Sequence, residues 1–81
     1  MKFVWDEEKN RQNIAKHGVS FEQAKRIFDG FTVDRIDDRF IYDEIRVFSL
    51  GMVGYATILA MIHTDRQGII RIISARRADR R

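Results

Sequence analysis

The hydrophobic positions of this chain change their spacing from a helical period in the first third to a strand period afterwards. Residues 20–30 show the clearest helical stretch, with Ser20 in the capping position, Gln23 three residues later and Gly30 at the end. The apolar residues of this stretch form one stripe at helical spacing: Phe21, Ala24, Ile27 and Phe28. We therefore predict a second helix here that packs through this stripe into the core.

A first helix is predicted just before it, after a short strand at residues 3–5. Asp6 is a typical N-cap, Glu7 and Glu8 suit the positive end of the helix dipole, and Gly18 suits the left-handed position that follows a helix. Few apolar residues lie between these ends, so we expect this helix to be mostly exposed or to present a polar face.

From residue 31 onward the pattern is that of strands. Residues 31–33 form a short one, and residues 40–50 alternate, with Ile45 and Val47 on one side and Glu44, Arg46 and Phe48 on the other. Residues 51–54 then read as a hairpin connection, 55–63 as a central strand, 64–68 as a second hairpin turn and 69–75 as the last strand.

Short turns between strands favour antiparallel neighbours. The predicted fold is therefore a single α+β domain over residues 1–81. Two N-terminal helices would pack on one face of a small, mainly antiparallel, twisted sheet.

Composition narrows the function. The 81 residues include no cysteine, which excludes disulfide frameworks and thiolate metal sites and suits the cytosol. We find no carboxylate cluster for a metal, no glycine-rich phosphate loop and no nucleophile elbow in the sequence. We therefore expect no metal and no cofactor. After Lys2 the chain turns acidic and no apolar segment of a signal peptide follows, and the longest apolar stretch, residues 50–62, is too short to span a bilayer. We therefore expect a cytoplasmic protein without a membrane partner.

Charge is unevenly distributed. Residues 66–81 hold six arginines and one acid, whereas residues 29–44 hold six acids and two arginines. Guanidinium groups grip phosphate bidentately, so the basic end is suited to an RNA backbone. We expect three arginines beyond the last strand to bind RNA: Arg76, Arg77 and Arg80.

Arg71 stands inside the apolar last strand, where an unpaired guanidinium is costly to bury. It must therefore meet a carboxylate or face a cleft that binds an anion. Glu44 and Arg46, two apart on a predicted strand, could share its face, with Lys16 and His17 at the rim.

Such a set could cleave RNA by transesterification without a metal. Glu44 or His17 would be the base, the arginines would hold charge on the phosphate, and His17 or Lys16 would be the acid. The alternative interpretation of Glu44, Arg46 and Arg71 is a structural ion-pair network.

Four segments together resemble the BrnT family of toxins: FVWDEEKN at 3–10, KHGVSF at 16–21, EIR at 44–46 and RIISARRA at 71–78. The resemblance spans nearly the whole chain. One departure is that BrnT-type toxins usually continue into a charged helical tail with a late tyrosine, whereas this sequence stops at Arg81.

The resemblance implies a type II toxin–antitoxin system, a RelE-like fold and a ribonuclease that arrests translation. It implies a BrnA-type antitoxin with a ribbon-helix-helix domain, in an assembly of two toxins and two antitoxins that contacts DNA only through the antitoxin. The polar positions it carries over are those already selected: Lys16, His17, Glu44, Arg46, Arg71 and Arg76. Two non-catalytic functions stay open, a module that occludes RNA or the ribosome and a corepressor that acts through its partner.

Overall fold

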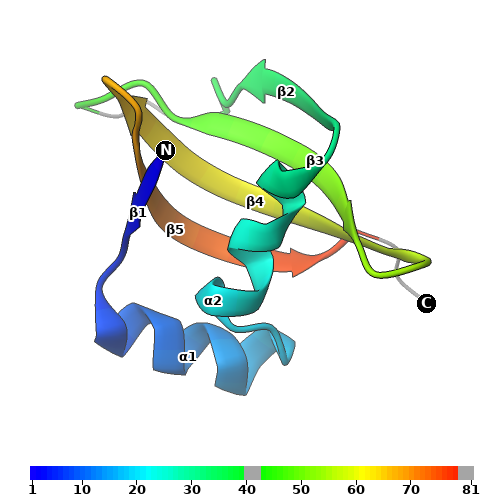
Figure 1. Ribbon diagram of the computed structural model, residues 1–81. Coiled ribbons are helices and arrows are strands. Elements are labelled where there is room, and N and C mark those ends of the chain that lie inside the picture. Colours follow the sequence, from blue (N-terminus) through cyan, green and yellow to red (C-terminus); the bar gives the residue numbers. More distant parts are fainter. Residues whose placement is uncertain (40–42, 79–81) are drawn as a thin grey trace.

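A five-stranded sheet forms the centre of the protein in the computed structural model, which describes residues 1–39 and 43–78 (Figure 1). The strands are β1 (Lys2–Val4), β2 (Thr32–Ile36), β3 (Val47–Val53), β4 (Thr57–Arg66) and β5 (Ile69–Arg77). They lie in the order β1-β5-β4-β3-β2. Three neighbouring pairs are antiparallel, whereas β1 runs parallel to β5, so the sheet is mixed.

Two helical segments precede the main hairpins. They are α1 (Glu7–His17) and α2 (Phe21–Ala24), the latter continued by a 3-10 helix, η1 (Lys25–Asp29). The predicted caps are confirmed: Asp6 accepts from the amides of Glu8 and Lys9, and Ser20 accepts from that of Gln23. Gly18 follows α1 with a φ of 73°, in the left-handed region that favours glycine. The α+β class is therefore confirmed.

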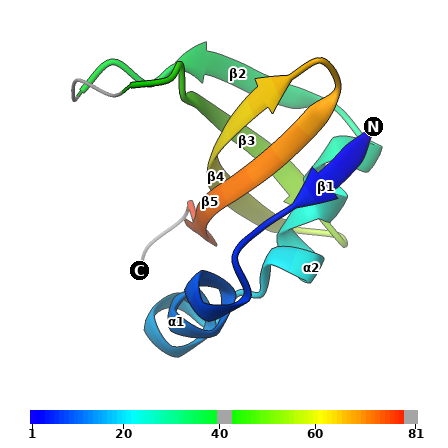
Figure 2. The same cartoon turned by 90° about the vertical axis from the view of Figure 1, so that its left-hand side faces the viewer.

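The prediction that both helices cover one face of the sheet is wrong for α1. The segment α2–η1 lies over one face, whereas α1 runs beside the outer edge of β5 (Figures 1 and 2). The short strand β1 pairs only with the first residues of β5, which leaves the rest of that edge open to another partner.

The side-chain amide of Asn13 provides that partner. Its nitrogen donates to the carbonyl oxygens of Val19 and Ala75, at 2.8 and 2.7 Å, and its oxygen accepts from the Ala75 amide at 3.2 Å. Asn10 accepts from the Phe21 amide at 2.8 Å. Helix α1 is thus attached through two buried asparagines rather than through an apolar stripe, which explains why its hydrophobic pattern is weak.

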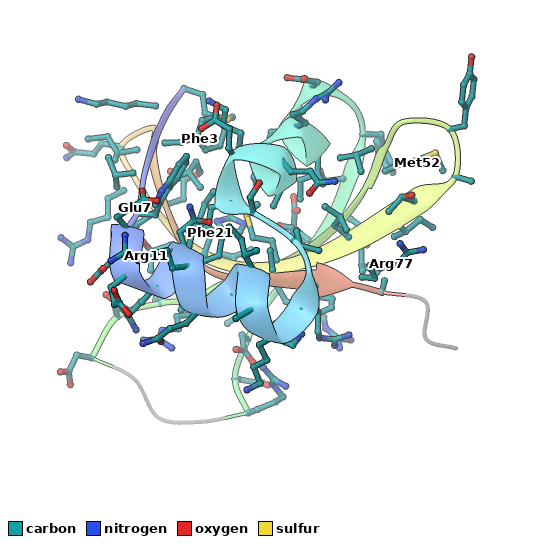
Figure 3. All side chains as sticks on the ribbon, turned by 90° about the horizontal axis from the view of Figure 1, so that it is seen from below. Phe3, Glu7, Arg11, Phe21, Met52 and Arg77 are labelled. Atoms are coloured by element: carbon teal, nitrogen blue, oxygen red, sulfur yellow. The ribbon has the colours of Figure 1, made fainter. Side chains whose placement is uncertain are left out.

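The core fills the space between the sheet, α1 and the α2–η1 segment. Phe21 lies at the centre of this core (Figure 3). Glu7 and Arg11 project from α1, far from Arg77 at the end of β5 (Figure 3). Gly51 sits where η1 presses on β3, and an added Cβ there would come within 2.6 Å of the Ile27 Cβ. The fully buried side chains of this core include Phe21, Ile27, Leu59, Met61, Ile70 and Ile72.

Several predicted boundaries are wrong, including that of the strand predicted over 31–33, which is β2 (Thr32–Ile36). The strand predicted over 40–50 starts only at Val47, since residues 43–46 are irregular, and residues 40–42 lie outside the described residues. The connection predicted at 51–54 belongs mostly to β3, and the turn follows at 54–56 with Gly54 at a φ of 65°. The second hairpin is confirmed, but its turn was predicted over 64–68 and comprises only Gln67 and Gly68, because residues 64–66 belong to β4. Both turn residues have positive φ, as a tight two-residue turn requires.

A buried histidine lies on the helix-covered side of this sheet. The His63 Nε2 is 2.8 Å from the Ser49 hydroxyl, which in turn lies 2.5 Å from a carboxylate oxygen of Asp34. Phe28 packs edge-on against the imidazole ring at 5.3 Å. His63 is therefore held as a hydrogen-bonded structural residue.

Mild acid is expected to destabilise the fold through this histidine. Burial lowers the pKa of His63 below its ordinary value of 6.5, so the unfolded chain binds the proton more readily. The contribution of His63 to stability is therefore fully present above pH 6.5, and it is lost as the pH falls toward the folded-state pKa. Thermal melts at several pH values between 7 and 5 should show this fall in wild type and a flatter profile in His63→Gln. Parallel profiles for the two proteins would refute this role.

Candidate functional site

The side of the sheet turned away from α2 and η1, here called the open face, carries the arginines that the sequence selected. Residues paired across antiparallel strands project to the same side. Arg71 pairs with Thr64, and Arg76 pairs with Ala60, whereas the intervening core residues Ile72 and Ala75 face the helices. Arg71 and Arg76 therefore both project from the open face of β5.

A β-bulge makes this common orientation possible. In a regular strand, residues five apart point to opposite faces. The register between β4 and β5 shifts at Ile62 and His63, so that Ile62 pairs with Ser74 while His63 pairs with Ile72. The extra residue, Ile73, reverses the alternation, and bulges re-aim side chains in this way near functional sites.

The first group of charges is an ion-pair cluster at one end of the open face. Arg71 Nη2 donates to Glu44 Oε2 at 2.6 Å, and Arg46 Nε donates to the same oxygen at 3.3 Å. The predicted association of these three residues is confirmed. The predicted reason, that Glu44 and Arg46 share one face of a strand, is wrong. Glu44 and Arg46 lie in the irregular segment before β3 rather than on a strand.

This cluster holds a fixed negative charge between two positive ones. The Arg71 guanidinium and, to a smaller extent, that of Arg46 hold the pKa of the Glu44 carboxyl below its usual range. Glu44 is therefore ionised at neutral pH. The Arg71 side chain remains 42% exposed, so its remaining donors can reach an incoming anion.

A hollow of about 260 Å³ lies beside the cluster. Among the described residues it is lined by Val4, Glu44, Thr64, Arg66, Ile69 and Arg71. Arg66 adds a third guanidinium that the sequence-based site left out. The cluster thus borders a concavity of mixed charge rather than a flat surface.

The second group of charges lies at the other end of β5. Lys16 and His17, at the C-terminus of α1, line a hollow of about 370 Å³ together with Arg76 and Arg77. Arg71 and Arg76 pair with Thr64 and Ala60, which are four residues apart on β4 and so roughly 13 Å apart along the strand. Lys16 and His17 therefore join Arg76 rather than the rim of the Glu44 cluster. Arg80, the remaining predicted RNA-binding residue, lies outside the described residues.

A third hollow, of about 510 Å³, lies between these two groups of charges and was not predicted from the sequence. Arg35 of β2 lies over the ring of Phe48 on β3, with its guanidinium carbon 5.3 Å from the ring centroid. Among the described residues this hollow is lined by Arg35, Ile36, Asp37, Asp38, Arg39, Phe48 and Arg76. The available signal was the alternation of residues 45–48, which predicted Arg46 and Phe48 on the same side of a strand. The structure confirms that Phe48 lies on the face away from the core.

Within the part of the chain that the structure describes, no three His, Cys, Asp or Glu side chains are grouped to hold a metal ion. No helix among those residues is long and apolar enough to cross a bilayer.

The fold and these charges define a small α+β protein with an arginine-rich sheet face. A family model described as "Ribonuclease toxin, BrnT, of type II toxin-antitoxin system" matches residues 5–81. The crystal structure of the Brucella abortus ribonuclease toxin BrnT is similar, with a TM-score of 0.71, 28% identity and 99% of each chain covered. A search of curated proteins gave no significant match.

The chain therefore belongs to the BrnT family of ribonuclease toxins of type II toxin–antitoxin systems. The resemblance stated from the sequence is confirmed. Membership also means that the functional partner of this chain is a protein antitoxin.

Proposed function

We propose that this toxin cuts RNA by metal-independent transesterification on its open face and thereby arrests translation in the cytoplasm. The observation that carries the proposal is the Arg71–Glu44–Arg46 cluster, which borders a hollow on the same face as Arg76. A RelE-like relationship of the fold belongs to the same proposal.

The cluster offers the electrostatic part of the reaction. Attack of a ribose 2′-oxygen on the adjacent phosphorus forms a phosphorane with added negative charge, and the 5′-oxygen then leaves. Arg46 and Arg71 are assigned to hold that charge. Glu44 positions both guanidiniums and, being ionised, can accept the proton of the 2′-hydroxyl.

The second group is assigned to flanking RNA. Lys16, His17, Arg76 and Arg77 line one hollow, and their distance from the cluster suits a neighbouring phosphate better than the reacting one. The role of His17 or Lys16 as proton donor to the leaving oxygen stays a prediction. It requires the RNA to bend between the two groups.

The antitoxin is proposed to be of BrnA type, with a ribbon-helix-helix domain, in a 2:2 assembly that reaches DNA only through the antitoxin. Val33, Met52 and Ile58 are exposed apolar residues on the open face, close in register to Arg76. An antitoxin segment with apolar and acidic residues could cover both this apolar patch and Arg76. Such a segment would neutralise the toxin by excluding RNA.

The test is the chemistry of the products. Purified protein incubated with RNA in excess EDTA is expected to leave fragments with 2′,3′-cyclic phosphate ends. Cleavage should weaken about twentyfold between about 50 and 200 mM salt if three arginines release counterions, and Arg26→Ala, on η1, should match wild type. Intact RNA from folded protein would instead support an occluding module, and cleavage abolished by EDTA would refute metal independence.

A further inference from the structure

The hollow beside Phe48 has the composition of a nucleobase site rather than a phosphate site. Phe48 provides an aromatic ring on the open face, and Arg35 places a planar cation 5.3 Å from its centroid. Bases stack on aromatic rings and on guanidinium planes, and this stacking tolerates every base because each has a π-face.

The charges around the hollow favour a neutral base with N–H donors. Asp37 and Asp38 line it together with the arginines, and a phosphate entering there would meet these carboxylates. The Asp37 carboxylate accepts from Arg39 Nε at 2.8 Å and Nη2 at 3.2 Å, which balances its charge. The Asp37 side chain is only 3% exposed, so the exposed Asp38 is the carboxylate that can accept from the edge of a base.

The position of the hollow matches a path for single-stranded RNA. Phe48 lies in the row of paired residues Arg35, Phe48, Ile62 and Ser74. The row that contains Arg71 lies on one side of the Phe48 row, and the row that contains Arg76 lies on the other. The two arginine rows are roughly 13 Å apart. Phosphates held at the two arginine rows would therefore leave an intervening base above Phe48.

We propose that Arg35 and Phe48 form a base-binding subsite that stacks one unpaired RNA base, with Asp38 facing its polar edge. The subsite rests on the proposed function, since it takes a base of the same RNA that the two arginine rows hold. This subsite contacts the base itself, whereas contacts to the RNA backbone carry no sequence information. Phe48 and Arg35 are thus base-binding residues rather than catalytic ones, and a preference among bases would come from the Asp38 carboxylate at the base edge.

The probe for this subsite is an octanucleotide of 2′-O-methyl uridines with a single central 2-aminopurine. The methyl groups prevent transesterification, so binding is measured apart from cleavage. Uridines stack weakly, and the purine is therefore the base expected to occupy the aromatic site. Its emission should fall when wild-type protein binds, while anisotropy of an end label reports affinity.

Phe48→Leu is expected to abolish the fall in emission and to raise the Kd about tenfold. Phe31→Leu is the matched control, because Phe31 is an aromatic residue with 86% exposure outside the hollow. It should behave as wild type. Arg35→Gln, a change at an exposed side chain, should weaken the signal as well, and it serves as the test if Phe48→Leu does not fold.

The outcomes separate this inference from the proposed function. Unchanged emission on wild-type binding, absence of binding, or a signal retained in both subsite variants would overturn the subsite, even if the protein cuts natural RNA. A signal lost in either folded subsite variant and kept in Phe31→Leu would support the subsite, even if natural RNA stays intact and the cleavage proposal fails.

Discussion

Replacement of Arg71 by alanine is expected to slow RNA cleavage by about a hundredfold, because it removes a guanidinium that we propose stabilises the developing phosphorane charge. The fold should tolerate the change. The Arg71 side chain is 42% exposed on the open face, and Glu44 keeps its ion pair with Arg46. Single-turnover cleavage of a short RNA, measured beside a thermal melt, separates the two effects.

Two further variants make this result specific. Arg71→Lys keeps the charge but loses the planar fork, so it should recover only part of the rate. Arg26→Ala removes an exposed arginine from η1 and should cut RNA like wild type. A large loss of thermal stability in Arg71→Ala with cleavage retained would instead identify the cluster as a structural ion-pair network.

The elements with strong local signals could be predicted from the sequence. Asp6, Ser20 and Gly18 marked helix ends because capping depends on the residue itself and its immediate neighbours. The turn at Gln67 and Gly68 was found for the same reason. The boundary of β3 was missed because residues 43–46 alternate like a strand although they lie outside the ladder.

The orientation of the arginines could not be predicted, because it depends on pairing between strands. Alternation alone places Arg71 and Arg76 on opposite faces, and only the shift at Ile62 and His63 brings them together. A bulge has no residue signature in this stretch of isoleucines. Sequence reasoning therefore selected Glu44, Arg46 and Arg71 correctly as a group but placed Lys16 and His17 with the wrong one.

The attachment of α1 escaped prediction for a related reason. Hydrophobic periodicity finds helices that pack through apolar side chains, whereas α1 is held by Asn10 and Asn13. Asparagine in a helix usually faces solvent or weakens the helix. Its role here becomes visible only once the open edge of β5 lies beside it.

Asn13→Ala is expected to destabilise the protein by about 3 kcal/mol, because it leaves buried backbone groups of Val19 and Ala75 without a hydrogen-bond partner. For a domain of this size that corresponds to a fall in Tm of roughly 15 °C. Denaturant unfolding and calorimetry measure both quantities. Gln12→Ala, at the exposed neighbouring position, should change stability by no more than about 0.5 kcal/mol.

The sign of the Asn13→Ala effect is decisive. Alanine is the better helix former by about 0.6 kcal/mol, so a surface asparagine replaced by alanine would stabilise α1. A loss of stability therefore requires that the side-chain amide completes the edge of β5. Asn13→Asp should also be destabilised, since a carboxylate would face two carbonyl oxygens that now accept hydrogen bonds. Unchanged or raised stability in the alanine variant would mean that water replaces these bonds and that the asparagine is not what attaches α1 to the sheet.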